Sequence, residues 1–175
     1  MQTRTILSKL RPSPVTLILL GLIAYLWFRP PAWVSAWNQP APDVPLDGRQ
    51  RLADLQGRVV LVNFWATWCP YCRHEMPAMQ SFYDDYRHCG FEIVAWSLDE
   101  SAETVAQFMH DKGYSFPAPL APPGVSAAFG GVERLPTSFV IDRAGRIRHK
   151  VSGQVHYARL ERLITPLLGD CSPRS

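Results

Sequence analysis

The chain has 175 residues, of which 47% are hydrophobic and 19% are charged. This composition supplies enough apolar surface for a packed core and excludes a largely disordered chain, while the length allows one domain of usual size. The net charge of +3 is modest, and the arginines are interspersed with acidic residues, which excludes the basic surface typical of a nucleic-acid-binding protein.

The N-terminal segment has the pattern of a membrane-targeting signal. Basic residues precede an uncharged apolar run over residues 15–28. As a helix this run would reach about 21 Å, which is shorter than a hydrocarbon core of about 30 Å and typical of a signal-peptide core. Two features argue against cleavage. An arginine and two prolines at residues 29–31 follow the apolar run directly, and the small residues at 34–36 lie farther from it than a cleavage site usually does. We therefore favour an uncleaved single-pass anchor over a cleaved signal peptide.

The rest of the chain divides into a linker and one folded domain. Three prolines within residues 38–45 favour a semi-extended connection there. The positive N-terminal segment is expected to stay in the cytoplasm and to direct the domain outward. We assign the segments as a cytoplasmic basic N-terminus at 1–14, the anchor at 15–28, a linker at 29–40, the domain at 41–171 and a tail at 172–175.

Strands and helices are predicted to alternate in the domain. Residues 58–65 and 92–97 are apolar runs rich in β-branched and aromatic residues, as in buried strands. Between them, residues 70–87 place apolar side chains at helical spacing, and Gly90 ends that helix. The other expected elements are a helix over 101–112, a proline-rich connection over 116–124, hairpin strands at 138–141 and 146–151, and a helix over 156–168. This order predicts an α/β fold with helices on both faces of a central sheet.

Two cysteines, Cys69 and Cys72, lie where the first buried strand passes into a helix. Free backbone N–H groups and the positive end of the helix dipole stabilise a thiolate there, and thiol pKa values at such positions fall from about 8.5 to about 3.5–7.5. We therefore expect Cys69 to be the nucleophile and Cys72, one turn along, to resolve the mixed disulfide. Pro70 suits the first helical position because it has no N–H to leave unpaired.

A lone Cys-x-x-Cys also occurs as half of a zinc site or as a structural disulfide. No second such pair and no His-x-x-x-His follows that would complete a metal site, and haem attachment would need a histidine where residue 73 is arginine. A copper chaperone using the same thiols would need a further ligand, for which His74 and Met76 are the neighbours in sequence. We expect no metal and no cofactor, since two thiols supply the chemistry.

The run VVLVNFWATWCPYCRHEMPAM at residues 59–79, Leu135-Pro136-Thr137, and FVIDRAGRI at 139–147 together strongly resemble the TlpA/ResA family of thioredoxin-like proteins. That family includes thiol reductases of cytochrome c maturation. The resemblance covers residues 41–168 and implies a thioredoxin-like fold, with a mixed sheet flanked by helices. It also implies an N-terminal tether and a domain that faces the periplasm or its Gram-positive equivalent.

The resemblance implies roles for residues on both sides of the cysteine pair. Cys69 and Cys72 match the attacking and resolving cysteines. Pro136 matches the cis-proline that faces the disulfide, a rare peptide conformation kept only where a fold demands it, and the backbone of Leu135 would pair with an extended substrate segment. The expected substrate-binding surface comprises Trp68, Pro70, Tyr71, Leu135 and Pro136.

Glu75 matches the acidic residue that tunes thiol acidity in reductases of this family. Thioredoxin keeps a buried acid on the strand where this chain has Asn63, so the proton-handling role is expected to fall to Glu75. The alternative is that Glu75 is a solvated carboxylate favoured by the helix dipole. Glu133, near the cis-proline, is a weaker candidate for substrate contact, with an exposed loop charge as its alternative.

The remaining cysteines, Cys89 and Cys171, follow the active-site helix and the last helix. In a thioredoxin fold these helices share a face and end opposite the active site. A structural disulfide between the two cysteines is therefore one hypothesis for an oxidising compartment, and two free thiols are the other.

The leading interpretation is a periplasmic protein-disulfide reductase held in the bacterial inner membrane. By resemblance, its substrates would be disulfides of apocytochrome c or copper-site cysteines of an oxidase. A membrane thiol transporter of the CcdA or DsbD type would then donate the electrons. The alternatives are an oxidase or isomerase of secreted proteins and a copper chaperone, since Pro-Tyr between the cysteines does not decide the direction of electron flow.

Overall fold

The computed structural model describes residues 14, 16–18, 20, 21, 38–46 and 50–174. The chain separates into two compact units, Met1–Val34 and Ser35–Ser175. In the first unit the described residues are helical and exposed. No helix in the described part of the chain combines the length and apolar character needed to cross a membrane. Most of the anchor predicted at 15–28 falls outside the described residues.

The second unit is built on a mixed β-sheet. Its described strands are ordered β1-β5-β4-β2-β3. β2 and β3 run parallel, and every other neighbouring pair is antiparallel. β2 is buried along its whole length, as its continuous apolar run predicts for a central strand. The bounds are β1 Gln39–Pro40, β2 Val59–Trp65, β3 Phe91–Ser97, β4 Thr137–Ile141 and β5 Arg146–Ser152.

β1 shows that part of the predicted linker belongs to the sheet. Gln39 pairs with Ile147, and Pro40 pairs with Arg146. The Nε of Arg146 also donates a 2.7 Å hydrogen bond to the side chain of Asn38. The physical reason is that β5 would otherwise present an unpaired edge, and proline is tolerated in an edge strand. The prediction that residues 29–40 are all linker is therefore wrong at its C-terminal end.

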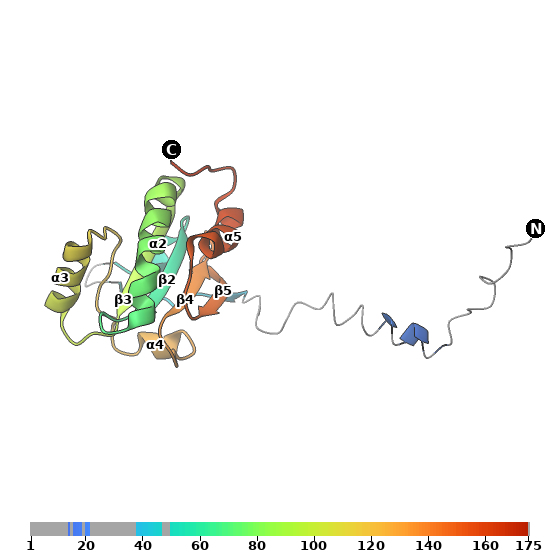
Figure 1. Ribbon diagram of the computed structural model, residues 1–175, viewed down its shortest axis with the longest axis horizontal. Helices are drawn as coiled ribbons and strands as arrows, with labels where there is room; N and C mark the ends of the chain where they lie inside the picture. The colour runs from blue at the N-terminus through green and yellow to red at the C-terminus, as the bar shows by residue number, and fades with distance from the viewer. Residues whose placement is uncertain (1–13, 15, 19, 22–37, 47–49, 175) are drawn as a thin grey trace, which may run out of the picture. The chain divides into compact units, whose positions relative to one another are not determined.

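The three longest described helices lie on one face of the sheet: α2 (Pro70–Tyr86), α3 (Ala102–Lys112) and α5 (Tyr157–Leu168). α2 and α5 run side by side (Figure 1), and the Tyr157 hydroxyl donates to Asp85 at 2.6 Å. The residues predicted to begin and end these helices are confirmed for α2 and α3. α2 begins at Pro70, the hydroxyl of Ser101 caps α3, and Gly113 ends α3 with a positive φ of 69°.

The opposite face is covered by short elements. These are the 3₁₀ turn η1 (Leu52–Leu55) and the single-turn helix α4 (Val125–Ala128). The ring of Phe64 on β2 lies within 5.6–6.1 Å of the rings of Trp96, Phe129 and Phe139. These large aromatic side chains fill this layer. Helical elements thus cover both faces, as predicted, but those on the second face are only about one turn long.

Candidate active site

Cys69 and Cys72 are joined by a disulfide at the start of α2. Cys69 is the N-cap, and its Sγ accepts a hydrogen bond from the backbone N–H of Cys72 at 3.3 Å. Cys69 keeps 5% of its surface exposed, whereas Cys72 has none. An incoming sulfur atom therefore reaches Cys69 first. Pro70 occupies the first helical position, as predicted.

Two large exposed side chains flank the disulfide. Trp68 and Tyr71 are each 66% exposed, although aromatic side chains of this size are usually well buried. Trp65, in contrast, is fully buried and donates from its indole N–H to the carbonyl of Ala95. Trp68 and Tyr71 thus form an apolar rim beside the redox pair, and Trp65 is part of the core.

The peptide bond between Leu135 and Pro136 is cis, as the resemblance implied. Pro136 is buried and Leu135 is half-buried. The carbonyl of Pro136 accepts from the backbone N–H of Gly153 at 2.8 Å. The loop that carries the cis-proline is therefore fixed to the segment that follows β5.

Glu75 is buried, with 1% of its surface exposed. Its Oε1 accepts from the side-chain amide of Asn63 and its Oε2 from the backbone N–H of Val155, both at 2.8 Å. Burial raises the pKa of the Glu75 carboxyl to about 7, while the hydrogen bonds from Val155 and Asn63 act to lower it. The alternative of a solvated first-turn carboxylate is wrong. Glu75 is a buried acid that titrates near neutral pH, one helical turn beyond Cys72.

Residues 153–155 form a segment that the sequence analysis missed, and each contacts a different part of the site. Gly153 binds the cis-proline carbonyl, the side chain of Gln154 donates to the carbonyl of Tyr71 at 3.0 Å, and Val155 binds Glu75. Two of these bonds use backbone N–H groups, which any non-proline residue would provide. Sequence pattern alone therefore gave no signal for this segment.

Asp99 is a second missed residue, and it positions the loop before the disulfide. Its carboxylate accepts from the N–H of Thr67 at 2.9 Å and from the Thr67 hydroxyl at 2.6 Å, and it also accepts from the Ser97 hydroxyl. Burial acts to raise the pKa of Asp99, but the hydrogen bonds from Ser97 and Thr67 prevail and hold it below its ordinary value. Asp99 thereby anchors the residue that precedes Trp68.

Three other candidate residues differ in how far they are exposed. Glu133 and His74 are exposed, and Met76 is buried in the core. Among the described residues, no cluster of His, Cys, Asp or Glu ligand atoms includes Cys69 or Cys72.

Cys89 and Cys171 are bonded to each other, with their Cα atoms 6.0 Å apart. Cys89 ends the 3₁₀ turn η2 (Arg87–Cys89), which continues α2, and Cys171 follows α5. The bond closes a sequence separation of 82 residues. The domain thus has a disulfide at each end of the α2 region.

A thioredoxin-like fold, a Cys-x-x-Cys disulfide at a helix start and a cis-proline just before β4 together define the class. It is that of the thiol–disulfide oxidoreductases. Comparison with known proteins agrees. The family model described as the AhpC/TSA family matches residues 37–150. A crystal structure of a thioredoxin-family thiol:disulfide interchange protein from Chlorobium tepidum is 35% identical, with a TM-score of 0.68 over 77% of this chain and 99% of that one.

Two relatives narrow the assignment. Thiol-disulfide oxidoreductase ResA of Oceanobacillus iheyensis is 40% identical over 111 residues, which are 63% of this chain and 58% of that protein. ResA of Bacillus thuringiensis is 38% identical over 125 residues, which are 69% of this chain and 72% of the relative. The chain belongs to the AhpC/TSA family and, within it, to the ResA-like thiol–disulfide oxidoreductases.

Proposed function

We propose that the chain is a membrane-anchored reductase of disulfides in exported proteins, with its domain in the periplasm. The observation that carries the reductase assignment is the buried Glu75 carboxyl, with a pKa of about 7, one turn beyond Cys72. The anchor is supported by the basic N-terminus and the apolar run over residues 15–28. The location is supported by the bond between Cys89 and Cys171, since such disulfides persist in oxidising compartments.

The reaction starts from the reduced dithiol. The Cys69 thiolate attacks one sulfur of a target disulfide, and the other target sulfur leaves as a thiolate. Cys72 then loses its proton and attacks Cys69, which releases the second target sulfur. Two electrons have moved to the target, whose two thiolates take up protons, and the enzyme is left with the Cys69–Cys72 disulfide seen in the structure.

Glu75 serves the second step as the acceptor of the Cys72 proton. A carboxyl with a pKa of about 7 is close to half ionised at neutral pH, which is the condition for accepting and returning a proton in each cycle. Because Cys72 has no exposed surface, bulk water is a poor base for it. A carboxylate already inside the domain replaces water in that role.

The substrates and the electron donor are part of the same proposal. The exposed rim of Trp68 and Tyr71 suits a protein substrate, which offers apolar contact area that a small thiol lacks. By resemblance to the TlpA/ResA family, the targets are apocytochrome c or the copper-site cysteines of an oxidase. The same resemblance implies a membrane thiol transporter of the CcdA or DsbD type as donor.

The deciding measurement is the reduction potential of the Cys69–Cys72 pair in the full-length chain. The chain is equilibrated with a dithiothreitol or glutathione series, alkylated, and mapped by peptide mass so that each disulfide is scored separately. A value near −270 mV, about that of thioredoxin, supports a reductase, whereas a value near −120 mV would make the protein an oxidase. In parallel, Cys72→Ser should accumulate a mixed disulfide with its target, and the double variant Cys69→Ser/Cys72→Ser should not.

A further inference from the structure

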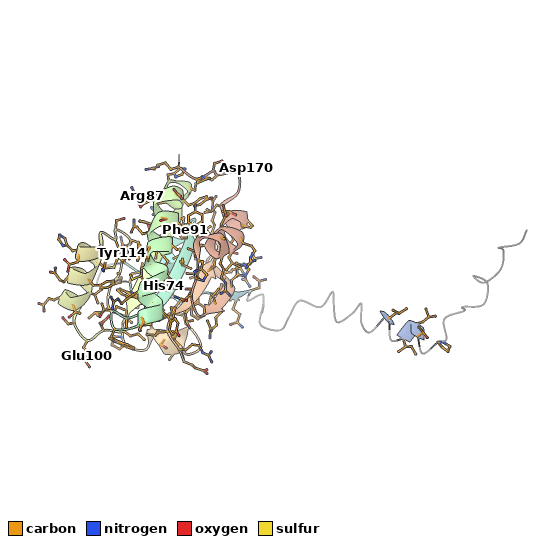
Figure 2. All side chains as sticks on the ribbon, viewed as in Figure 1. His74, Arg87, Phe91, Glu100, Tyr114 and Asp170 are labelled. Atoms are coloured by element: carbon orange, nitrogen blue, oxygen red, sulfur yellow. A yellow bond between two sulfur atoms is a disulfide. The ribbon has the colours of Figure 1, made fainter. Side chains whose placement is uncertain are left out.

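The second disulfide has a histidine beside it. His88 immediately precedes Cys89, and both lie where α2 ends, at the same end of the domain as Cys171. Figure 2 shows that end through two labelled neighbours, Arg87 and Asp170. In the described part of the chain, His88, Cys89 and Cys171 form the one group of three or more His, Cys, Asp or Glu side chains whose ligand atoms converge, all within 4.8 Å of one another.

Four donor atoms meet at this point. The Nε2 of His88 lies 3.5 Å from the Sγ of Cys89 and 3.8 Å from the Sγ of Cys171. The backbone carbonyl oxygen of Ser172 lies 3.8 Å from each of the two sulfur atoms. His88 is exposed and both cysteines are half-buried. An ion in solution can therefore reach the set.

These separations match the edges of a tetrahedral zinc site. With Zn–S bonds of about 2.3 Å and Zn–N bonds of about 2.05 Å, a tetrahedron places nitrogen and sulfur ligands about 3.6 Å apart. The two distances from His88 are already close to that value. The sulfur atoms, bonded to each other in the oxidised chain, would have to separate to about 3.8 Å. We infer that reduction of the Cys89–Cys171 disulfide creates a zinc site formed by His88, Cys89, Cys171 and the carbonyl of Ser172.

The surroundings keep the two halves of this site together when the disulfide is open. The guanidinium of Arg143 donates to the carbonyl of Cys89 at 3.2 Å and to the carbonyl of Leu168 at 3.0 Å. It therefore joins the end of η2 to the end of α5 without help from the sulfur atoms. Cys171 lies beyond α5 in the C-terminal segment, so its sulfur can move away from Cys89 without displacing a helix.

The chemistry balances with a dithiol as reductant. The dithiol gives two electrons and two protons to the Cys89–Cys171 bond and becomes a disulfide itself, leaving two thiols on the chain. Zinc then binds both sulfur atoms as thiolates and releases the two protons to solvent. Re-oxidation by thiol–disulfide exchange with an external disulfide transfers the two electrons of the thiolates to that disulfide, which leaves as a dithiol, restores the Cys89–Cys171 bond and expels the ion. The reduced chain can therefore bind zinc at this site, and the oxidised chain cannot.

The test uses the untagged full-length chain with Cys69→Ser and Cys72→Ser, so that no other thiols compete for the metal. The chain is reduced with a phosphine, freed of reductant without oxygen, and titrated with Zn²⁺ against a chromophoric chelator. The expected result is one Zn²⁺ per chain. Cobalt substituted for zinc should give thiolate-to-metal charge-transfer bands and tetrahedral ligand-field bands. The oxidised chain should bind neither ion.

Variants separate this site from adventitious binding. His88→Ala should weaken zinc binding by at least about tenfold, Cys171→Ser should weaken it further, and His110→Ala, which removes an exposed histidine elsewhere, should leave it unchanged. Far-UV circular dichroism shows whether each variant is folded, and His88→Gln replaces His88→Ala if that chain unfolds. Less than stoichiometric zinc in the reduced parent, or equal affinity with and without His88, would overturn the inference.

Discussion

The side-chain amide of Asn63 on β2 donates to the carboxylate of Glu75 on α2 across 2.8 Å. The same amide nitrogen donates to the hydroxyl of Ser138 on β4 at 2.9 Å. Since residue 63 is an amide, Glu75 has no second carboxylate as its hydrogen-bond partner there. The raised pKa of Glu75 therefore comes from burial and not from a like charge.

Glu75→Gln should remove a pH dependence of stability. In the wild type the pKa of Glu75 is about 7 in the folded chain, whereas the ordinary value, expected in the unfolded chain, is 4.5. The folded chain therefore binds more protons, so the free energy of unfolding should fall as pH rises from about 4.5 to about 7, by about 3 kcal/mol in all. The variant should lack this decline. Chemical denaturation at a series of pH values in this window measures it.

The matched control is Glu103→Gln, which neutralises an exposed glutamate in the first turn of α3. Its pH profile should follow the wild type. Glutamine is accommodated at position 75 because the Asn63 amide can rotate by half a turn and accept a hydrogen bond instead of donating one. A Glu75→Gln chain that kept the full decline would show that another group titrates in this window.

Asp99→Ala should loosen the loop that leads into the disulfide. The change removes the acceptor of the Thr67 N–H, the Thr67 hydroxyl and the Ser97 hydroxyl, and should cost about 1–3 kcal/mol of stability at neutral pH. Because the pKa of Asp99 is lowered on folding, its contribution is present above its ordinary pKa of about 3.9 and is lost as pH falls through the lowered value. Urea denaturation at pH 7 and at pH 3 should show the difference from wild type shrinking in acid.

A suitable comparison is Asp111→Ala, since Asp111 is exposed on α3 and accepts from Gln107. That change should alter stability by less than about 0.5 kcal/mol. If Asp99→Ala and Asp111→Ala lost the same amount of stability, the hydrogen bonds between Thr67 and Asp99 would not contribute more than an exposed surface contact.

Trp68→Ala and Tyr71→Ala should affect protein substrates and spare small ones. Both side chains are largely exposed, so each variant should unfold within about 0.5 kcal/mol of the wild type. Loss of an aromatic contact at a protein interface costs more than about 1 kcal/mol where that residue is important for binding. Reduction of a folded protein disulfide should therefore slow by about tenfold, while reduction of glutathione disulfide should keep its rate. Equal slowing of both reactions would place these rings in the chemistry and not in recognition.

Cys89→Ser with Cys171→Ser should destabilise the domain and leave its redox pair unchanged. A bond that spans 82 residues contributes about 4–5 kcal/mol in the chain-entropy model. Guanidinium denaturation of the oxidised chains measures this loss. The reduction potential of Cys69–Cys72 should equal that of the wild type, because the two disulfides lie at opposite ends of the α2 region. A shifted potential would reveal coupling between them.

Most of the fold was predictable because its elements carry local signals. Pro70 at a helix start, Ser101 as a cap and Gly113 as a stop each act through the backbone of their own turn, and the limits of α2 and α3 agree with the sequence to within a residue. β1 has no such signal. Gln39 and Pro40 join the sheet because β5, more than one hundred residues later, offers an edge.

The same distinction applies to the site. Cys69, Cys72 and Pro136 belong to a motif with a family resemblance, and the disulfide and the cis bond are where that resemblance implied. The partners of Glu75 were not predictable, because Val155 contributes a backbone N–H from a distant loop. Asp99 was also missed, since an aspartate shortly after a strand is equally typical of a solvated turn.

α2 runs for 17 residues, or about 25 Å, and the two disulfides lie at its two ends. A partner that docks on Trp68 and Tyr71 covers the first bond and leaves the second in solvent. An electron donor that recognises this aromatic rim thus meets only one of two chemically similar targets. Where each bond lies thus determines which one such a donor reduces, in addition to the thiol acidity that the helix start gives to Cys69.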